Sequence, residues 1–290
     1  MKILLLISFI LSTNVKAQDN SKNSLKNSSK KVTTTNEKKK PTKKAPVSVQ
    51  KIKKVEKRNV YGGRHWRLEV PGKGPVHVWI PKGYNRKRGA GMVIYVHGYH
   101  TTADKTWENH KLGLQFKNSK QNAMFVVPEA PQNMNEAVVW DSLSSLKKSI
   151  QKANIRLPSG PTIAIGHSGA FRTIASWVDN RFLSRIILLD AMYGGQKAWE
   201  DFITSGKKTS SHKLIILGKD TADKGKSFAK KFPRARILKK MPKSFYGFPK
   251  NIRGGAFKVL FIKTEISHSA IVTSMSVIPV LLRLTPLKPL

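Results

Sequence analysis

The sequence contains no cysteine at any of its 290 positions. This absence excludes disulfide bonds, a thiol nucleophile, metal sites built from thiolates and lipid attachment to an N-terminal cysteine. A nucleophile, if the chain has one, must therefore be another side chain.

Acidic residues are also scarce. The chain has 16 Asp and Glu against 54 Lys and Arg, which gives a formal net charge of +38. Such a positive field favours anionic partners, namely an anionic cell-envelope polymer, an acidic lipid surface or, less favoured, nucleic acid. Solubility alone is the alternative explanation of the charge.

Long apolar runs are missing as well. The run Ile3–Leu11 is too short to span a bilayer. It follows a Met-Lys start and precedes Val15-Lys16-Ala17, which places small residues at the −3 and −1 positions of a cleavage site. This pattern predicts a signal peptide over residues 1–17. We therefore expect an exported protein, periplasmic or secreted, with no transmembrane segment in its mature form.

Residues 18–58 differ in composition from the rest of the chain. They hold 14 Lys and Arg but only 3 Asp and Glu, among many Ser, Thr and Asn. Few of these side chains can offset the entropy cost of ordering the backbone, so we expect a disordered Lys-rich tail. Residues 59–290 still have a net charge of +25, so the folded part is basic too.

The pattern of residues 59–290 predicts one α/β domain. Alternating segments at 65–70 and 76–81, joined by the turn "PGKGP", indicate an antiparallel hairpin. Continuous apolar runs, typical of strands buried on both faces, occupy 91–98, 122–130, 161–169, 184–192, 212–220 and 256–264. Helical patterns occupy 102–119, 140–154, 169–182, 196–206, 223–232 and 267–284. This alternation predicts a mostly parallel sheet with helices on both faces.

The stretch "IGHSGAF" at 165–171 places Ser168 between a core strand and a helix. A sharp strand-to-helix turn brings the two backbones close together, so small residues are needed two positions before and after the central residue. Gly166 and Ala170 occupy those positions. This is the nucleophile-elbow pattern with alanine for the last glycine.

With this motif, the chain resembles the α/β-hydrolase superfamily, of the secreted bacterial esterase or lipase type. The resemblance covers about residues 61–290 and rests on "VHVWIPKGY", "VIYVHGYH", "AIGHSGA", "IILLDA" and "SHSAI", in that order. It implies an α/β-hydrolase fold with Ser168 as nucleophile. Ala170 departs from the family's glycine, and a methyl group fits where strand and helix cross slightly further apart.

The resemblance also implies the base, His268, which follows the last predicted strand and opens the last helix. The other histidines fit less well. We expect His65 and His77 in the hairpin, His110 on a helix surface, His212 at the opposite end of the sheet, and His167 beside the serine but directed elsewhere.

A carboxylate should orient the imidazole. Asp190 directly ends the run "IILLD", and Asp220 follows "LIILGK". The family more often uses the later strand, but Asp220 stands only two residues past Gly218 rather than three. We favour Asp190, with Asp220 as the alternative and Asp223 a distant third.

Two backbone N–H groups should stabilise an oxyanion, those of Gly169 and Tyr99. His97 and His100 are expected to shape the loop that contains Tyr99. Neither has an acid or a third histidine at ligand spacing, so we do not expect a metal there.

Residues 191–211 are too few for a cap domain, so the site should be open. Candidate lining residues are Tyr99, Trp107, Trp140, Met192 and Tyr193. In the segment 236–255, Phe245, Tyr246 and Phe248 alternate with basic residues, which is typical of a loop packed by its own aromatics or, less favoured, of a glycan or nucleic-acid surface.

The leading hypothesis is an exported serine hydrolase that cleaves carboxylic esters through an acyl-enzyme and needs no cofactor. A peptidase or amidase of the same fold is one alternative. The other is a non-catalytic protein that binds anions or the cell envelope on a hydrolase scaffold, because a fold does not establish a function.

Overall fold

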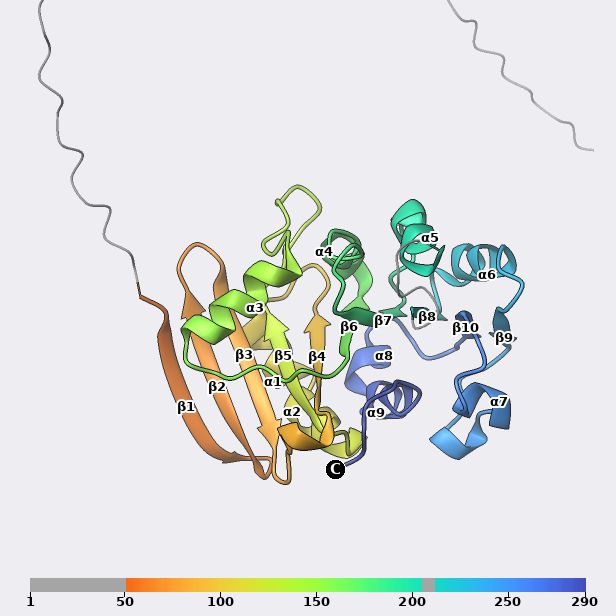
Figure 1. Cartoon of the computed structure of the whole chain (residues 1–290). Coiled ribbons are helices and arrows are strands. Elements are labelled where there is room, and N and C mark those ends of the chain that lie inside the picture. Colours follow the sequence, from red (N-terminus) through yellow and green to blue (C-terminus); the bar gives the residue numbers. More distant parts are fainter. Residues whose placement is uncertain (1–50, 205–211) are drawn as a thin grey trace, which may run out of the picture. The chain divides into compact units, whose positions relative to one another are not determined.

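A computed structural model describes residues 51–204 and 212–290. The predicted signal peptide and most of the predicted tail lie outside the described residues. The described part contains a sheet of ten strands in the order β1-β2-β3-β5-β4-β6-β7-β8-β10-β9 (Figure 1).

The strands and helices follow one another in the alternation that the sequence predicts. The strands are β1 (Lys53–Val60), β2 (Gly63–Val70), β3 (Gly74–Pro81), β4 (Gly91–Val96), β5 (Ala123–Pro128), β6 (Thr162–His167), β7 (Leu183–Leu189), β8 (Lys213–Gly218), β9 (Arg236–Leu238) and β10 (Val259–Lys263). The helices are α1 (Ala103–Asn109), α2 (Leu112–Ser119), α3 (Leu143–Lys152), α4 (Phe171–Ala175), α5 (Gln196–Thr204), α6 (Ala222–Lys230), α7 (Lys250–Arg253), α8 (Ala270–Thr273) and α9 (Val277–Leu282), with short 3₁₀ turns η1 (Arg86–Arg88), η2 (Ser168–Ala170) and η3 (Phe245–Gly247).

The sheet has an antiparallel and a parallel part. Strands β1, β2 and β3 pair antiparallel, and β3 pairs antiparallel with β5. From β5 through β4, β6, β7, β8 and β10 to β9, every pairing is parallel. The predicted α/β class with an N-terminal antiparallel hairpin is confirmed.

Helices cover both faces of the sheet. Figure 1 shows α3, α4, α5 and α6 on one side and α1, α2, α7, α8 and α9 on the other. Each side has its own apolar core, one containing Trp140, Trp177 and Trp199 and the other Trp79, Phe116 and Phe125. Strands β4, β5 and β6 are buried along their whole length, which explains their unbroken apolar sequences.

The folded part begins earlier than the sequence predicts. Residues 53–58, expected in the tail, form most of β1, which pairs with β2 at the edge of the sheet. Nearly all of its side chains are exposed, so it has no apolar alternation that could reveal it.

Two predicted helices are divided, and one strand was not predicted. The helix expected over 102–119 breaks at Lys111 (φ +49°), and that over 267–284 breaks at Met275 (φ +59°). Both residues have a left-handed backbone that ends a helix. The short edge strand β9 was not expected from the sequence, because its three residues are largely exposed.

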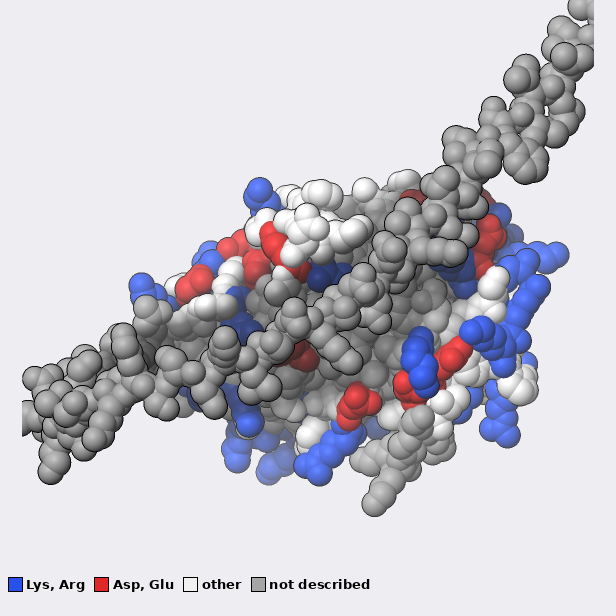
Figure 2. All heavy atoms as spheres, turned by 90° about the horizontal axis from the view of Figure 1, so that it is seen from above, with Lys and Arg blue, Asp and Glu red and all other residues white. Residues whose placement is uncertain are grey.

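Basic side chains outnumber acidic ones on the surface drawn in Figure 2. Lys and Arg side chains lie around its edge, with fewer Asp and Glu among them. In the part of the chain that the structure describes, no helix is long and apolar enough to cross a membrane.

Between β7 and β8 the described residues form only α5, so no large cap is present there.

A chain of hydrogen bonds, buried at His65 and His77 and partly exposed at Asp104, fastens α1 to the antiparallel strands. His65 Nε2 lies 2.9 Å from His77 Nδ1, and His77 Nε2 lies 2.8 Å from Asp104 Oδ1. Asp104 also accepts two hydrogen bonds of 2.7 Å from the Arg67 guanidinium. The His65 ring stacks on Trp107 with a centroid distance of 4.4 Å. Since a carboxylate only accepts, His77 Nε2 donates to Asp104 and His77 Nδ1 accepts from His65.

This arrangement needs a neutral His77, because the His77 Nδ1 must keep a lone pair to accept from His65. Burial disfavours a charge on His65 as well. Burial lowers the pKa of His65 from 6.5 to about 3 and the pKa of His77 to about 4, although Asp104 opposes the shift. In the unfolded chain these two histidines therefore bind protons near pH 6.5, whereas in the folded chain they bind them only near pH 3 to 4. The contribution of the two neutral histidines to folding stability is complete above pH 6.5 and is lost as the pH falls towards 3.

We expect the melting temperature to fall between pH 7 and pH 4, and to fall less steeply in His65→Phe, which retains the stacking on Trp107 but cannot be protonated. The matched control is His100→Gln, which alters an exposed histidine. Circular dichroism melts at several pH values measure both slopes. Equal slopes for wild type and His65→Phe would contradict the role of this network.

Candidate active site

Four parallel strands bring the predicted catalytic residues to one edge of the sheet. Strands β6, β7, β8 and β10 are neighbours in that order. Ser168 directly follows β6, Asp190 follows β7, and His268 follows β10 after a short loop. The carboxyl ends of parallel strands are where open α/β sheets collect their sites.

Ser168 lies on a strained turn. Its φ of +53° is left-handed, which is uncommon for a residue other than glycine. Ser168 is the first residue of the 3₁₀ turn η2, and α4 follows that turn directly. A Cβ atom at Gly166 would lie 2.5 Å from Ile174 Cδ1 and 3.2 Å from Ala170 Cβ. The turn thus needs a glycine at position 166 and accommodates the methyl group of Ala170, as the sequence predicts.

Asp190 is fully buried and surrounded by donors. Its Oδ1 accepts from the backbone N–H groups of Lys219 (3.0 Å) and Thr221 (2.9 Å) and from the Thr221 hydroxyl (2.8 Å). Its Oδ2 accepts from the backbone N–H of Asp220 at 3.1 Å. Burial alone would raise the pKa of Asp190, but these bonds and the one from His268 hold it well below its usual range. The carboxylate is therefore ionised.

His268 is bonded to this carboxylate. Its Nδ1 lies 2.7 Å from Asp190 Oδ2, and its side chain is 29% exposed. The hydrogen bond to Asp190 raises the pKa of His268 against the opposing effect of burial. Because Nδ1 donates to Asp190, the neutral ring has its free lone pair on Nε2, as a general base requires. Within the described residues, no hydrogen bond joins Ser168 to this ring.

Asp220 occupies a different position from Asp190. Its carboxylate lies 3.8 Å from His268 Nδ1, and its side chain is 56% exposed. Its backbone N–H helps to bind Asp190 instead. Asp223, the third candidate, is exposed in the first turn of α6. The geometry therefore pairs His268 with Asp190, the residue that the sequence favours.

The loop after β4 packs directly against Ser168. A Cβ atom at Gly98 would lie 2.8 Å from Ser168 Cβ, and one at Gly169 would lie 2.5 Å from the Tyr99 ring. In the described part of the chain, the backbone N–H of Tyr99 donates no hydrogen bond. Tyr99 is thus next to the residue that follows the serine, where the second oxyanion donor is expected.

His97 shapes this loop as expected from the sequence. It is fully buried, and its Nδ1–H donates to the carbonyl of Gly98 at 2.7 Å. Its Nε2 lies 3.0 Å from Glu129 Oε1. Glu129 Oε2 accepts from the backbone N–H of Ala103, the first residue of α1, at 3.1 Å. His100, in contrast, is exposed and has a left-handed backbone.

Arg172 is a positioning residue that sequence analysis missed. Its guanidinium donates to the Tyr99 hydroxyl at 3.3 Å and to the carbonyls of Met134 at 2.7 Å and Glu136 at 2.9 Å. It lies one helical turn after Ser168 and joins the loop after β4 to the loop after β5. No motif indicates such contacts, because the two backbone carbonyls and the Tyr99 hydroxyl are all distant from Arg172 in sequence.

Two further histidines, His110 and His167, lie beneath the proposed catalytic residues. The prediction that His110 lies on a helix surface is wrong. It follows α1, is half-buried, and its Nδ1 lies 3.1 Å from the Tyr95 hydroxyl. His167 points away from Ser168, and its Nε2–H donates to the backbone carbonyl of His268 at 3.1 Å. Burial lowers the pKa of His167 to about 3, so it fixes the backbone of His268 as a neutral donor.

The predicted aromatic lining is only partly present. Trp107, Trp140 and Met192 are buried in the core, contrary to the prediction. Tyr99 and Tyr193 are partly exposed, and the Tyr193 ring lies 6.5 Å from that of His268. His212, which directly precedes β8, is buried against Phe202, with a ring distance of 4.4 Å.

The predicted aromatic loop at 236–255 is largely packed on itself. The Phe245 and Tyr246 rings are 5.5 Å apart, and Arg253 and Arg283 lie over them. Phe248 is buried in the core. Only Tyr246 is well exposed.

In the described ranges, Asp190, Asp220 and His268 are the one group of acidic and histidine side chains that is close enough to hold a metal ion. The Asp190 oxygens, however, already accept hydrogen bonds from N–H and O–H donors. A cation would have to displace those donors, so the group suits a carboxylate–imidazole pair better than a metal.

The pairing predicts how His268 titrates. We expect an imidazole pKa above 6.5 in the wild type, a clear fall in Asp190→Asn, and a smaller change in Asp220→Asn, because Asp220 is more distant and solvent-screened. NMR titration, with His268→Gln to assign the resonance, measures all three. A larger fall in Asp220→Asn would transfer the pairing to Asp220.

Comparisons with known proteins identify the fold. No protein-family model matches the sequence, and no curated protein sequence matches it. A feruloyl esterase module from Clostridium thermocellum, complexed with sinapinate, superimposes with a TM-score of 0.52 at 13% identity, over 80% of this chain and 94% of that module. A protein named FAE superimposes with a TM-score of 0.50 at 12% identity, over 80% of this chain and 88% of that one. Together with its sheet order and strand-to-helix elbow, this likeness shows that the chain has an α/β-hydrolase fold.

Proposed function

We propose that this protein is a serine hydrolase that cleaves carboxylic esters through an acyl-enzyme. The observation that supports it most is the 2.7 Å bond between His268 and the buried Asp190, at the edge of the sheet where Ser168 lies on a strained turn. A buried carboxylate, an imidazole with Nε2 free and a serine on an elbow are the parts of a nucleophilic triad.

In the first step, Ser168 Oγ attacks the acyl carbon of the ester, and His268 Nε2 takes the hydroxyl proton. The carbonyl oxygen becomes an oxyanion, for which the backbone N–H groups of Tyr99 and Gly169 are the proposed donors. The imidazolium then gives its proton to the departing alcohol oxygen as the ester C–O bond breaks. Asp190 remains ionised and stabilises the imidazolium.

In the second step, water attacks the acyl-enzyme. His268 takes a proton from the water, the tetrahedral intermediate forms again, and its collapse releases the carboxylic acid and returns the proton to Ser168 Oγ. The triad, the ester and the attacking water together account for every proton, so the proposed cycle needs no cofactor.

The proposed substrate is an ester presented at an open surface. The described residues between β7 and β8 form only α5, and the partly exposed rings of Tyr99 and Tyr193 lie beside the site. The structurally similar feruloyl esterase module is complexed with sinapinate, an aromatic acid. Esters of aromatic acids are therefore the first class to assay, and export through residues 1–17 remains part of this proposal.

Ser168→Ala and His268→Ala should each reduce kcat on p-nitrophenyl acetate by roughly 10³-fold or more, and the double variant should be hardly slower than either, because nucleophile and base act as a unit. The control is His100→Gln, an exposed histidine outside the proposed triad. Steady-state kinetics with matched thermal melts measure the effect. Additive losses, or full activity in Ser168→Ala, would contradict the mechanism.

Gly98→Ala tests the close packing between the loop after β4 and the serine. The new methyl would lie 2.8 Å from Ser168 Cβ, so the loop or the serine must shift. We expect kcat to fall by about 10²-fold or more, as for loss of an oxyanion donor. Gly254→Ala is the control, since its nearest neighbour would be 3.5 Å away. Equal activity of both variants would show that this contact does not position the site.

A further inference from the structure

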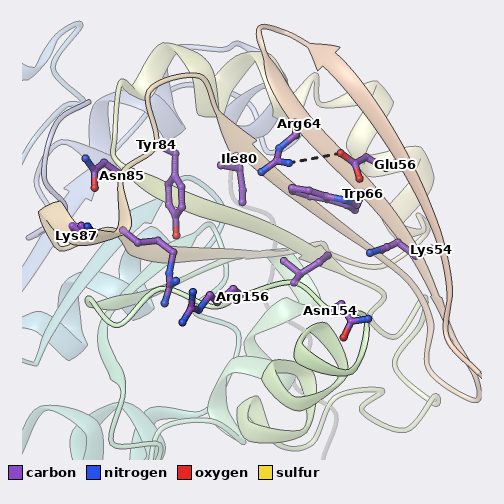
Figure 3. A pocket seen from close by; sticks show the side chains of 12 residues that line it. Lys54, Glu56, Arg64, Trp66, Ile80, Tyr84, Asn85, Lys87, Asn154 and Arg156 are labelled. Carbon is purple, nitrogen blue, oxygen red and sulfur yellow. Dashed lines mark ion pairs between the residues drawn. The ribbon is translucent and has the colours of Figure 1, made fainter.

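A cavity lies on the antiparallel part of the sheet. Its volume is about 610 Å³, within the range of ligand pockets in proteins. Residues of β1, β2 and β3, the connection from β3 to β4, and the segment that follows α3 line it (Figure 3). It shares no residue with the site around Ser168, so it needs a separate explanation.

The cavity is strongly cationic. Lys54, Arg64, Arg86, Lys87 and Arg156 line it, and Glu56 is the only acidic residue in its wall. We call this cavity the basic groove. Glu56 Oε1 lies 4.0 Å from Arg64 and 3.9 Å from Arg58. In the described part of the chain no ion pair involves Arg86, Lys87 or Arg156, so their charges are available to a ligand.

Two buried polar atoms in the groove have no partner within the described residues. They are the Tyr84 hydroxyl and the Arg86 Nε. Figure 3 shows the Tyr84 hydroxyl directed towards the end of the groove where Arg156 lies. Leaving buried donors unpaired costs free energy, so such atoms call for an acceptor. Burial also raises the pKa of Tyr84 to about 12, which keeps its hydroxyl protonated.

The walls favour a sugar over a nucleic-acid base. Trp66 is only 5% exposed, and the Arg64 guanidinium lies 5.0 Å from its ring, so it offers no free face for base stacking. The amide side chains of Asn85 and Asn154 also line the cavity, and Ile80 and Ile155 supply apolar wall. Amide side chains can donate to and accept from sugar hydroxyls, and guanidinium groups donate to anionic oxygens.

We propose that the basic groove binds an anionic carbohydrate, with a carboxylate or phosphate bound by Tyr84, Arg86 and Arg156 and the sugar hydroxyls near Asn85 and Asn154. The groove would then hold the protein on an acidic glycan independently of the chemistry at Ser168. This inference does not depend on the proposed esterase activity.

Isothermal titration calorimetry of the full chain at about 0.15 M salt tests the proposal, because this salt screens diffuse surface charge. The probes are trigalacturonate for a carboxylate, mannose 6-phosphate for a phosphate, and neutral maltotriose. We expect at least one anionic sugar to bind and maltotriose not to bind. Binding of trigalacturonate would indicate a carboxylate ligand, and binding of mannose 6-phosphate would indicate a phosphate ligand.

Variants locate the binding. Tyr84→Phe keeps the ring and should weaken binding by about tenfold, as expected for a hydrogen bond to a charged group. Arg86→Ala/Arg156→Ala should abolish it. The matched control is Lys226→Ala/Lys230→Ala, which removes the same charge from exposed positions on α6 and should change the affinity by less than about threefold. Circular dichroism confirms that each variant folds.

The proposal is overturned if neither anionic sugar binds, if maltotriose binds as well, or if the control variant loses as much affinity as the groove variants. Binding of a dT oligomer in place of the sugars, lost in the same groove variants, would assign the groove to nucleic acid and also reject it. Ser168→Ala should bind the sugar unchanged, and Tyr84→Phe should keep its esterase activity. Failure of one proposal is therefore distinguishable from failure of the other.

Discussion

The buried carboxylate of Asp190 is the constraint on which the site depends. An ionised group without solvent is tolerated only where donors surround it. Here three successive backbone N–H groups, from Lys219 to Thr221, and the Thr221 hydroxyl point at it. They come from the loop after β8, the strand next to β7, and so the pairing of two parallel strands creates the environment in which the charge persists. The remaining lone pair of Oδ2 then fixes His268.

Other hydrogen bonds position the elbow and the neighbouring loops relative to the pair formed by Asp190 and His268. His167 donates to the backbone carbonyl of His268 and also directly precedes Ser168, so one residue connects the elbow to the histidine loop. His97 and Glu129 hold the loop after β4, and Arg172 connects that loop to α4. The buried pair His65 and His77 fastens α1, which begins just past the same loop. Hydrogen bonds between buried residues thus connect the protein core to the site.

The sequence predicts the parts of this structure that are encoded by short local patterns. Runs of apolar residues indicate the parallel strands, because strands buried on both faces need them, and small residues around Ser168 indicate the elbow. Asp190 could be favoured because it directly ends such a run. The sequence could not exclude Asp220, since that choice depends on three backbone N–H groups that turn towards Asp190 only in the folded chain.

Features without a local pattern were missed or misplaced. Strand β1 is exposed and rich in lysine, so its composition is that of a tail although its backbone pairs with β2. Trp107 was expected near the substrate but stacks on His65, a contact between residues 42 positions apart. The basic groove likewise combines residues near positions 54–66, 80–87 and 154–156. Such groupings follow from sheet topology and have no spacing that a sequence motif could show.

The central claim is that Ser168 is a nucleophile activated by folding. Intact-protein mass spectrometry after treatment with a fluorophosphonate, followed by peptide mapping, tests it most directly. The account predicts one covalent adduct, on the peptide that contains Ser168, which forms with the folded protein and not after thermal unfolding or in His268→Ala. No adduct on the folded wild type, or an adduct at another residue, would contradict it.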